Sequence, residues 1–133
     1  MTTTTMTPKT NNARDCALAA LDHITRLIRL RDRCNDAGHC DWADDIQRQI
    51  DEMPLAVQVR TGWHAPGDDS DAGEYRIPLT WGGPAVQIVG DLSSFYEPES
   101  AALQCQDWFT GWETVPADEI VLLDFARCFY FGD

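Results

Sequence analysis

Positively charged residues are scarce in this chain of 133 residues. Ten Lys and Arg stand against 22 Asp and Glu, and the formal net charge at pH 7 is −12. The shortage is greatest in residues 77–133, where Arg127 is the only base among nine acids. A field of this sign repels nucleic acid and attracts basic protein surfaces. The composition therefore argues against direct nucleic-acid binding and predicts a positively charged protein partner.

Signals for export, membrane insertion and disulfide bonding are also missing. No apolar run is long enough for a signal peptide or a transmembrane helix, and no membrane partner is expected. The five cysteines are odd in number and follow no regular framework, which predicts reduced thiols in a bacterial cytoplasm. The Thr-rich residues 1–12 are expected to form a disordered tail, and residues 13–133 a single domain. The apolar fraction of 44% is sufficient for a core.

Metal and catalytic motifs are weak. Cys34, His39 and Cys40, with His23 earlier in the chain, carry the donor atoms that zinc prefers. Neither CxxC nor HxxxH spacing occurs, so residues without a shared role are the simpler interpretation. A catalytic Cys and His pair would need a proximity in space that the sequence does not reveal. We therefore predict no catalytic residue, no cofactor and no metal.

The first third of the chain has the pattern of two helices. Apolar residues recur at spacings of three and four over residues 13–34, and Asn12 can cap the start of this helix. Gly38 lies in the break that follows, and a second helix is predicted between Asp41 and Pro54. Its apolar face is expected to consist of Trp42, Ile46, Ile50 and Met53. A short link favours packing of the two helices as an antiparallel hairpin.

After Pro54 the apolar period changes to two, which is typical of strands. Strands are predicted at residues 57–63, 75–81, 85–92 and 101–109. Pro78 lies inside the second of these, so this strand should be an edge strand or contain a bulge. A final helix is expected from about Pro116 to Tyr130. The predicted fold is thus α+β: an N-terminal helical hairpin, a four-stranded mainly antiparallel sheet and a C-terminal helix packed on the sheet.

Two segments stand out as candidate contact surfaces. Asp68, Asp69, Asp71 and Glu74 gather in one loop, which is either solvated or contacts a basic partner; the residue order of a calcium-binding EF-hand is absent. Residues 104–113 interleave Trp108 and Trp112 with Asp107 and Glu113. This mixture is typical of an interface hot spot, although both tryptophans could instead fill the core.

Three segments carry a resemblance to known proteins. They are residues 82–92 (GGPAVQIVGDL), 103–112 (LQCQDWFTGW) and 125–132 (FARCFYFG). They resemble a group of small acidic proteins encoded by phages and prophages of proteobacteria. The resemblance implies inhibition of a host defence, as anti-CRISPR proteins do by occupying basic nucleic-acid channels. It covers about the C-terminal two-fifths of the chain and carries no catalytic residue with it.

The leading hypothesis is a non-enzymatic inhibitor that binds a basic surface of a host protein or ribonucleoprotein complex, with carboxylates in place of phosphates. Its candidate contacts are Asp68, Asp69, Asp71, Glu74, Glu97, Glu99, Asp107, Trp108, Trp112 and Glu113. One alternative is a phage accessory or assembly protein that forms homo-oligomers through its aromatic residues. Another is a small enzyme or ligand-sequestering protein that uses the sheet face, with His64 as acid or base.

Overall fold

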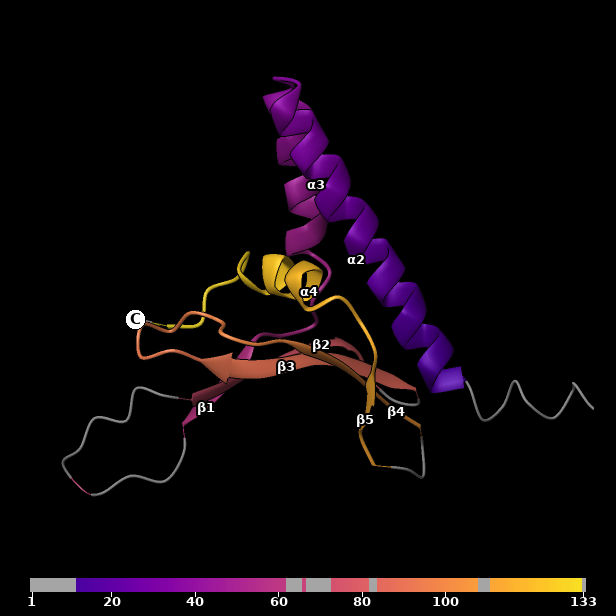
Figure 1. Ribbon diagram of the computed structural model, residues 1–133, viewed down its shortest axis with the longest axis vertical. Coiled ribbons are helices and arrows are strands. Elements are labelled where there is room, and N and C mark those ends of the chain that lie inside the picture. Colours follow the sequence, from indigo (N-terminus) through magenta and orange to yellow (C-terminus); the bar gives the residue numbers. More distant parts are fainter. Residues whose placement is uncertain (1–11, 62–65, 67–72, 82–83, 108–110, 133) are drawn as a thin grey trace, which may run out of the picture.

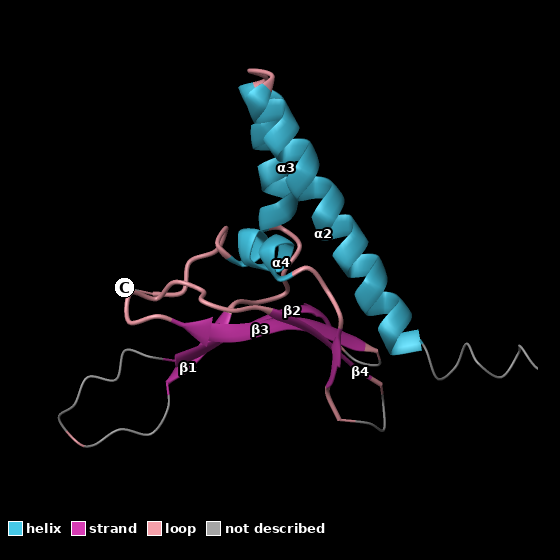
Figure 2. Cartoon of the chain, viewed as in Figure 1, coloured by secondary structure: helices cyan, strands magenta, loops and turns pink. Residues whose placement is uncertain are grey.

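The computed structural model describes residues 12–61, 66, 73–81, 84–107 and 111–132. Within them the fold is α+β, and three helices lie on one side of an antiparallel sheet (Figure 1). Among the described residues, no helix lies on the opposite side of the sheet (Figure 2). One cluster of buried apolar residues joins the helices to the sheet.

The predicted helical hairpin is confirmed. Helix α2 spans Asn12–Asp36 and helix α3 spans Cys40–Asp51, so Asn12 belongs to the helix rather than to a tail. Gly38 takes a φ of 81° in the link, a conformation that favours glycine. The prediction that Trp42 lies on the apolar face of α3 is wrong, because its side chain is 59% exposed. Ala43 is buried in its place, together with Ile46 and Ile50.

The sheet has five strands, and the prediction of four is wrong. They are β1 (Gln58–Thr61), β2 (Gly73–Thr80), β3 (Ala85–Leu92), β4 (Ala102–Gln106) and β5 (Glu113–Val115). Neighbours in sequence pair antiparallel in the order β1-β2-β3-β4-β5. Strand β5 was missed because three residues are too short to display a period of two. Strand β3 has the predicted bounds, whereas β4 ends at Gln106 rather than at residue 109.

The predicted irregularity at Pro78 is confirmed as a shift of register between Pro78 and Thr80. Strand β2 is not an edge strand, since it lies between β1 and β3. The pairing with β1 covers Gly73 to Arg76 only, so no partner on β1 requires the amide that proline lacks. The carbonyl of Pro78 accepts a hydrogen bond from the amide of Leu55 at 2.9 Å.

Helix α4 (Glu119–Ala126) is shorter than predicted at both ends. It begins after Asp118, whose side chain caps it by accepting a hydrogen bond from the amide of Ile120. The chain then leaves the helical path, and the ring of Phe131 packs 5.0 Å from that of Tyr75. Phe125 and Ala126 are fully buried, which confirms that this helix packs on the core.

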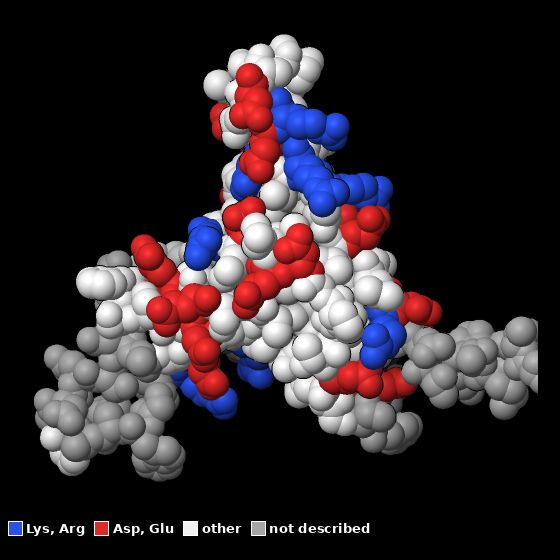
Figure 3. All heavy atoms as spheres, in the orientation of Figure 1, with Lys and Arg blue, Asp and Glu red and all other residues white. Residues whose placement is uncertain are grey.

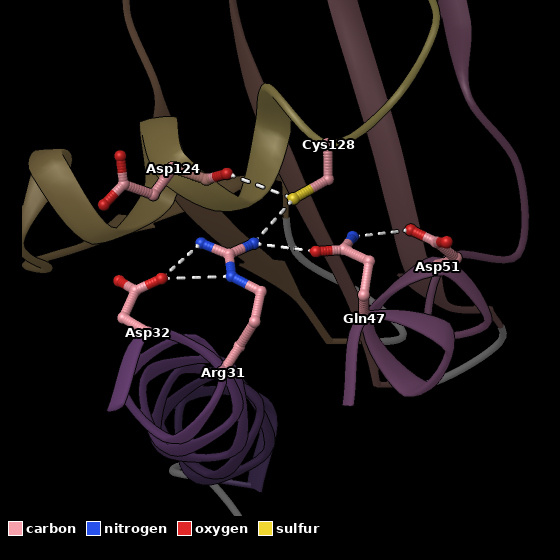
Figure 4. A network of polar contacts seen from close by, with 6 residues as sticks. All are labelled: Arg31, Asp32, Gln47, Asp51, Asp124 and Cys128. Carbon is pink, nitrogen blue, oxygen red and sulfur yellow. Dashed lines mark hydrogen bonds and ion pairs between the residues drawn. The ribbon is translucent and has the colours of Figure 1, made fainter. Parts of the chain in front are cut away.

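A network of polar contacts ties the hairpin to the end of α4 (Figure 4). The guanidinium of Arg31 donates to Asp32 at 3.0 Å, to Gln47 at 2.9 Å and to the sulfur of Cys128 at 3.4 Å. Burial lowers the pKa of Arg31, but the hydrogen bonds to Asp32 and Cys128 outweigh burial, so that the net shift is upward. A permanently charged side chain thus holds all three helices together.

Across the described ranges, every helix falls short of the length and apolar character needed to traverse a bilayer.

Candidate functional site

The two faces of the sheet differ in chemistry. On the face toward the helices, Ile77 pairs with Ile88, Ile88 with Leu103, and Leu103 with Val115. All four are almost completely buried. Alternate residues of the same strands point to the opposite side, which we call the open face. It is predominantly polar, and one of its rows runs from Gln87 through Gln104 to Thr114.

A groove of about 690 Å³ lies over the open face. Side chains from four neighbouring strands contribute to its lining, and Trp112, 39% exposed, lines it just before β5. The charged and amide residues among its lining are Gln58, Arg60, Glu74, Arg76, Gln87, Asp91, Gln104 and Glu119. The volume is within the range of ligand-binding pockets in proteins. The groove is therefore large enough for a ligand and contains hydrogen-bonding groups.

The amides of Gln87 and Gln104 form the centre of this groove. Gln87 is only 4% exposed, and its Nε2 donates to Oε1 of Gln104 at 2.8 Å. Its own Oε1 is buried and has no hydrogen-bond donor among the described residues. A buried acceptor without a donor costs about 1–3 kcal/mol. Gln87 is not among the residues predicted from the sequence, where its signal is a lone polar residue inside the apolar run of a strand.

Charges of both signs lie along the groove. Arg60 forms an ion pair with Glu74 at 2.6 Å, and Arg76 donates from Nε to Oε1 of Gln58 at 2.8 Å. The carboxylates of Asp91 and Glu119 form no ion pair with a described residue. Three carboxylates thus face two guanidinium groups, and the groove has a small excess of negative charge.

The connection between β3 and β4 forms a second feature, the acidic turn, which comprises residues 91–99. Ser93 fixes it, because its Oγ accepts from the amides of Phe95 and Glu97 at 3.1 and 3.3 Å. The carbonyl of Asp91 accepts from the amide of Glu99 at 2.8 Å. Tyr96 has a φ of 61°, a left-handed conformation that side chains rarely adopt. The turn is therefore defined by its own hydrogen bonds.

The acidic turn presents carboxylates beside an exposed aromatic ring. Asp91, Glu97 and Glu99 form no ion pair with any residue in the described ranges. Phe95 is 83% exposed, the largest fraction among the large apolar side chains that the structure describes. An aromatic ring with carboxylates around it is typical of a protein interface. Glu97 and Glu99 are among the residues predicted from the sequence, whereas Phe95 is not; its signal is an aromatic residue in a loop that contains Ser and Pro.

The predicted contact residues do not share one location. Glu74 lies in the groove and is paired with Arg60, while Glu113 on β5 is paired with Arg14 of α2 at 3.2 Å. Glu97 and Glu99 lie together in the acidic turn, and Trp112 lines the groove. Asp107 follows strand β4. The remaining four, Asp68, Asp69, Asp71 and Trp108, lie outside the described residues.

Two side chains with nucleophilic atoms, Cys105 and Tyr75, have raised pKa values. Burial raises the pKa of the Cys105 thiol, and the negative charge of Glu113 raises it further. Since the thiolate is the reactive form, Cys105 is suited to the core rather than to catalysis. Burial likewise raises the pKa of Tyr75, whose hydroxyl donates to the carbonyl of Ser100 at 2.6 Å. His64, the proposed acid or base, lies outside the described residues.

The residues considered for zinc take ordinary places in the hairpin. The ring of His39 stacks on Trp42 with centroids 4.2 Å apart, while Cys34 is half-buried and Cys40 is exposed. No group of three or more His, Cys, Asp or Glu side chains in the described residues is arranged to hold a metal ion.

Comparison of the chain with protein-family models, with curated proteins and with solved structures finds no match. The resemblance to phage proteins therefore stays a prediction.

Proposed function

We propose that the chain is a non-enzymatic binding protein that docks on a basic surface of a host nucleic-acid-handling defence complex and inhibits it, as an anti-CRISPR protein would. The observation that carries this proposal is the acidic turn. There, Asp91, Glu97 and Glu99 lack ion-pair partners among the described residues, and Phe95 is 83% exposed. Carboxylates bind Arg and Lys through the charge-assisted hydrogen bonds that phosphates make.

The distribution of charge supports docking through the acidic turn. In Figure 3, basic side chains lie along one flank of the helical hairpin with acidic ones beside them, and acidic side chains, with a few basic ones nearby, gather around α4 and the adjoining part of the sheet. Helix α2 contains five arginines and four aspartates. Residues 84–107 contain four acids and no base. A basic partner is therefore steered toward the acidic turn rather than toward α2.

The turn also has the rigidity that an interface needs. The hydrogen bonds of Ser93 and the bond between Asp91 and Glu99 hold the loop in one conformation before binding. A preformed loop loses little conformational entropy when a partner docks. Phe95 then supplies apolar area to bury, and the carboxylates supply charge complementarity.

Affinity capture from a bacterial lysate tests the proposal. We expect the tagged protein to retain a basic nucleic-acid-binding complex at low salt and to release it at high salt, since ionic strength screens exposed charges. The triple variant Phe95→Ser, Glu97→Lys, Glu99→Lys should bind this complex about 30-fold more weakly, which corresponds to about 2 kcal/mol. Mass spectrometry identifies the proteins retained.

A matched control changes the same charge elsewhere. Asp44→Lys with Glu52→Lys reverses two exposed acids at α3 and its C-terminal cap and should leave the capture unchanged. The captured complex should also lose its affinity for nucleic acid when this protein is added. Recovery of only this chain, or equal capture by the triple variant, would contradict the proposal.

A further inference from the structure

We propose that the groove on the open face binds an extended basic segment of the partner protein, and that Gln87 and Gln104 hydrogen-bond one of its peptide groups. The inference rests on the proposed function for the charge of the partner. It adds a second contact site, which is lined by strands β1 to β4 and also reaches Glu119 at the start of α4.

The unpaired oxygen of Gln87 is the first argument. Gln87 is 96% buried, lines the groove and leaves its Oε1 without a donor in the described residues. Gln104 uses its Oε1 to accept from Gln87, and its amide nitrogen, which has two N–H donors, can donate into the groove. An acceptor beside a donor matches the N–H and C=O of a peptide group. Because this oxygen is covered in the free protein, a peptide N–H reaches it only when the Gln87 side chain turns toward the groove, and the peptide then supplies the missing donor.

The charge of the groove is the second argument. Asp91 and Glu119 form no ion pair with a described residue, although Asp91 accepts from Oγ of Ser100 and Glu119 from the amide of Ala101. Glu74 is paired with Arg60. Arg or Lys side chains of a ligand would meet these carboxylates. Trp112 and Arg76 would also suit a nucleotide, but the net charge of −12 repels an anionic ligand. A basic peptide agrees with both the local and the long-range charge.

The length of the groove and its connection to the acidic turn also suit a short extended peptide. The groove crosses β1 to β4, and three spacings of about 4.8 Å give about 14 Å, the length of about four extended residues. Asp91 lies both in the groove and at the start of the acidic turn, where its carbonyl binds the amide of Glu99. A partner on the acidic turn can therefore extend a short segment into the groove.

Side-chain amide signals in two-dimensional NMR spectra report directly on this site. The probes are the capped pentapeptide Ala-Arg-Ala-Lys-Ala, its acidic counterpart Ala-Glu-Ala-Asp-Ala, and adenosine monophosphate. We expect the basic peptide to shift the side-chain signals of Gln87 and Gln104 to saturation, and the acidic peptide to bind at least about ten-fold more weakly. The Gln87→Leu variant assigns the Gln87 signals by their disappearance.

The same variant separates binding from folding. Gln87→Leu should weaken the basic peptide about ten-fold and raise the midpoint of thermal unfolding, because it removes a buried amide without a full set of partners. Gln49→Leu, an exposed glutamine on α3, is the control and should not alter peptide binding. A lower midpoint for Gln87→Leu would show that Gln87 serves the fold and would overturn the inference.

Two further results would overturn it. One is the absence of shifts at Gln87 and Gln104 with the basic peptide. The other is a shift of these signals by adenosine monophosphate alone, which would assign the groove to a small anionic ligand. Equal capture by the acidic-turn triple variant and the native chain, together with a normal peptide titration, would count against the proposed function and leave the groove intact.

Discussion

The two faces of the sheet are built from the same strands and carry opposite chemistry. Toward the helices, Ile77, Ile88 and Leu103 are each 0% exposed and lie in one row across three strands. On the open face the neighbouring row holds Gln87 and Gln104, whose amides bond to each other. Alternate side chains of a strand point to opposite faces, so a shift of one residue exchanges these environments.

The face toward the helices contributes mainly to stability, and the open face is suited to binding. Burial of apolar area on the covered face is the largest favourable contribution to folding. The open face instead keeps a polar atom of Gln87 without a partner, which lowers stability. Substitutions on the covered face should therefore change the free energy of unfolding, and those on the open face should change binding.

Truncation of neighbouring residues on β3 should give the largest contrast. Ile88→Ala empties a fully buried site and should lower the free energy of unfolding by about 3–4 kcal/mol. Val89→Ala removes a half-buried side chain on the open face and should cost about 1 kcal/mol or less. Urea unfolding of the two variants measures both values. Equal losses would show that the open face is covered in the protein.

Gly90→Ala is expected to be slightly less costly than Ile88→Ala. A Cβ at this position would lie 2.7 Å from Cε1 of Tyr75 and would collide with the carbonyl of Ser100. The backbones of β3 and the 93–101 connection must separate, at a cost of about 3 kcal/mol. Thermal unfolding detects the loss, and Gly111→Ala, where a Cβ meets nothing within 4 Å, serves as control. A neutral Gly90→Ala would refute this close approach.

Tyr75→Phe should have the smallest effect at neutral pH. It removes the hydrogen bond to the carbonyl of Ser100 and should cost about 1 kcal/mol. Burial raises the pKa of Tyr75 above its ordinary value of 10.0, so the folded state favours the neutral phenol. This contribution is complete below pH 10 and is lost as the pH rises further, because the unfolded chain then ionises first.

The measurement for Tyr75 compares urea unfolding at about pH 8 and about pH 11. The Tyr75→Phe variant should lose less stability between these values than the native chain. A part of the alkaline loss should persist, since the pKa of Cys105 is also raised by burial. An unchanged alkaline loss in Tyr75→Phe would mean that Tyr75 is not protected in the folded state.

Elements with a strong period or a distinct stop signal were predictable. The spacing of Ile24, Leu27 and Ile28 specifies the buried face of α2, and the short apolar run around Ile88 specifies β3 with its correct bounds. Trp42 was placed wrongly because helical spacing alone admits either Trp42 or Ala43 beside Ile46 and Ile50. The packing of α3 against α2 decides for the smaller residue.

The candidate sites were harder to predict than the fold. Glu97 and Glu99 stand out as acids near Pro98, but Phe95 acquires its meaning only from the exposure of its ring. Glu74 and Glu113 are both predicted contacts, but they lie on different strands, β2 and β5. Glu74 forms an ion pair with Arg60 and Glu113 forms one with Arg14. Such pairings depend on tertiary contacts that the spacing of residues does not encode.

The sequence by itself determined the sign and size of the charge, the order of helices and strands, and the apolar residues available for a core. These are local properties, set by composition and by periods of 3.6 and 2. Only the tertiary structure decided which carboxylates keep their charge unpaired, which aromatic rings stay exposed, and that Gln87 is buried with one atom unsatisfied. The reason is that burial and pairing are set by residues brought together from distant parts of the chain.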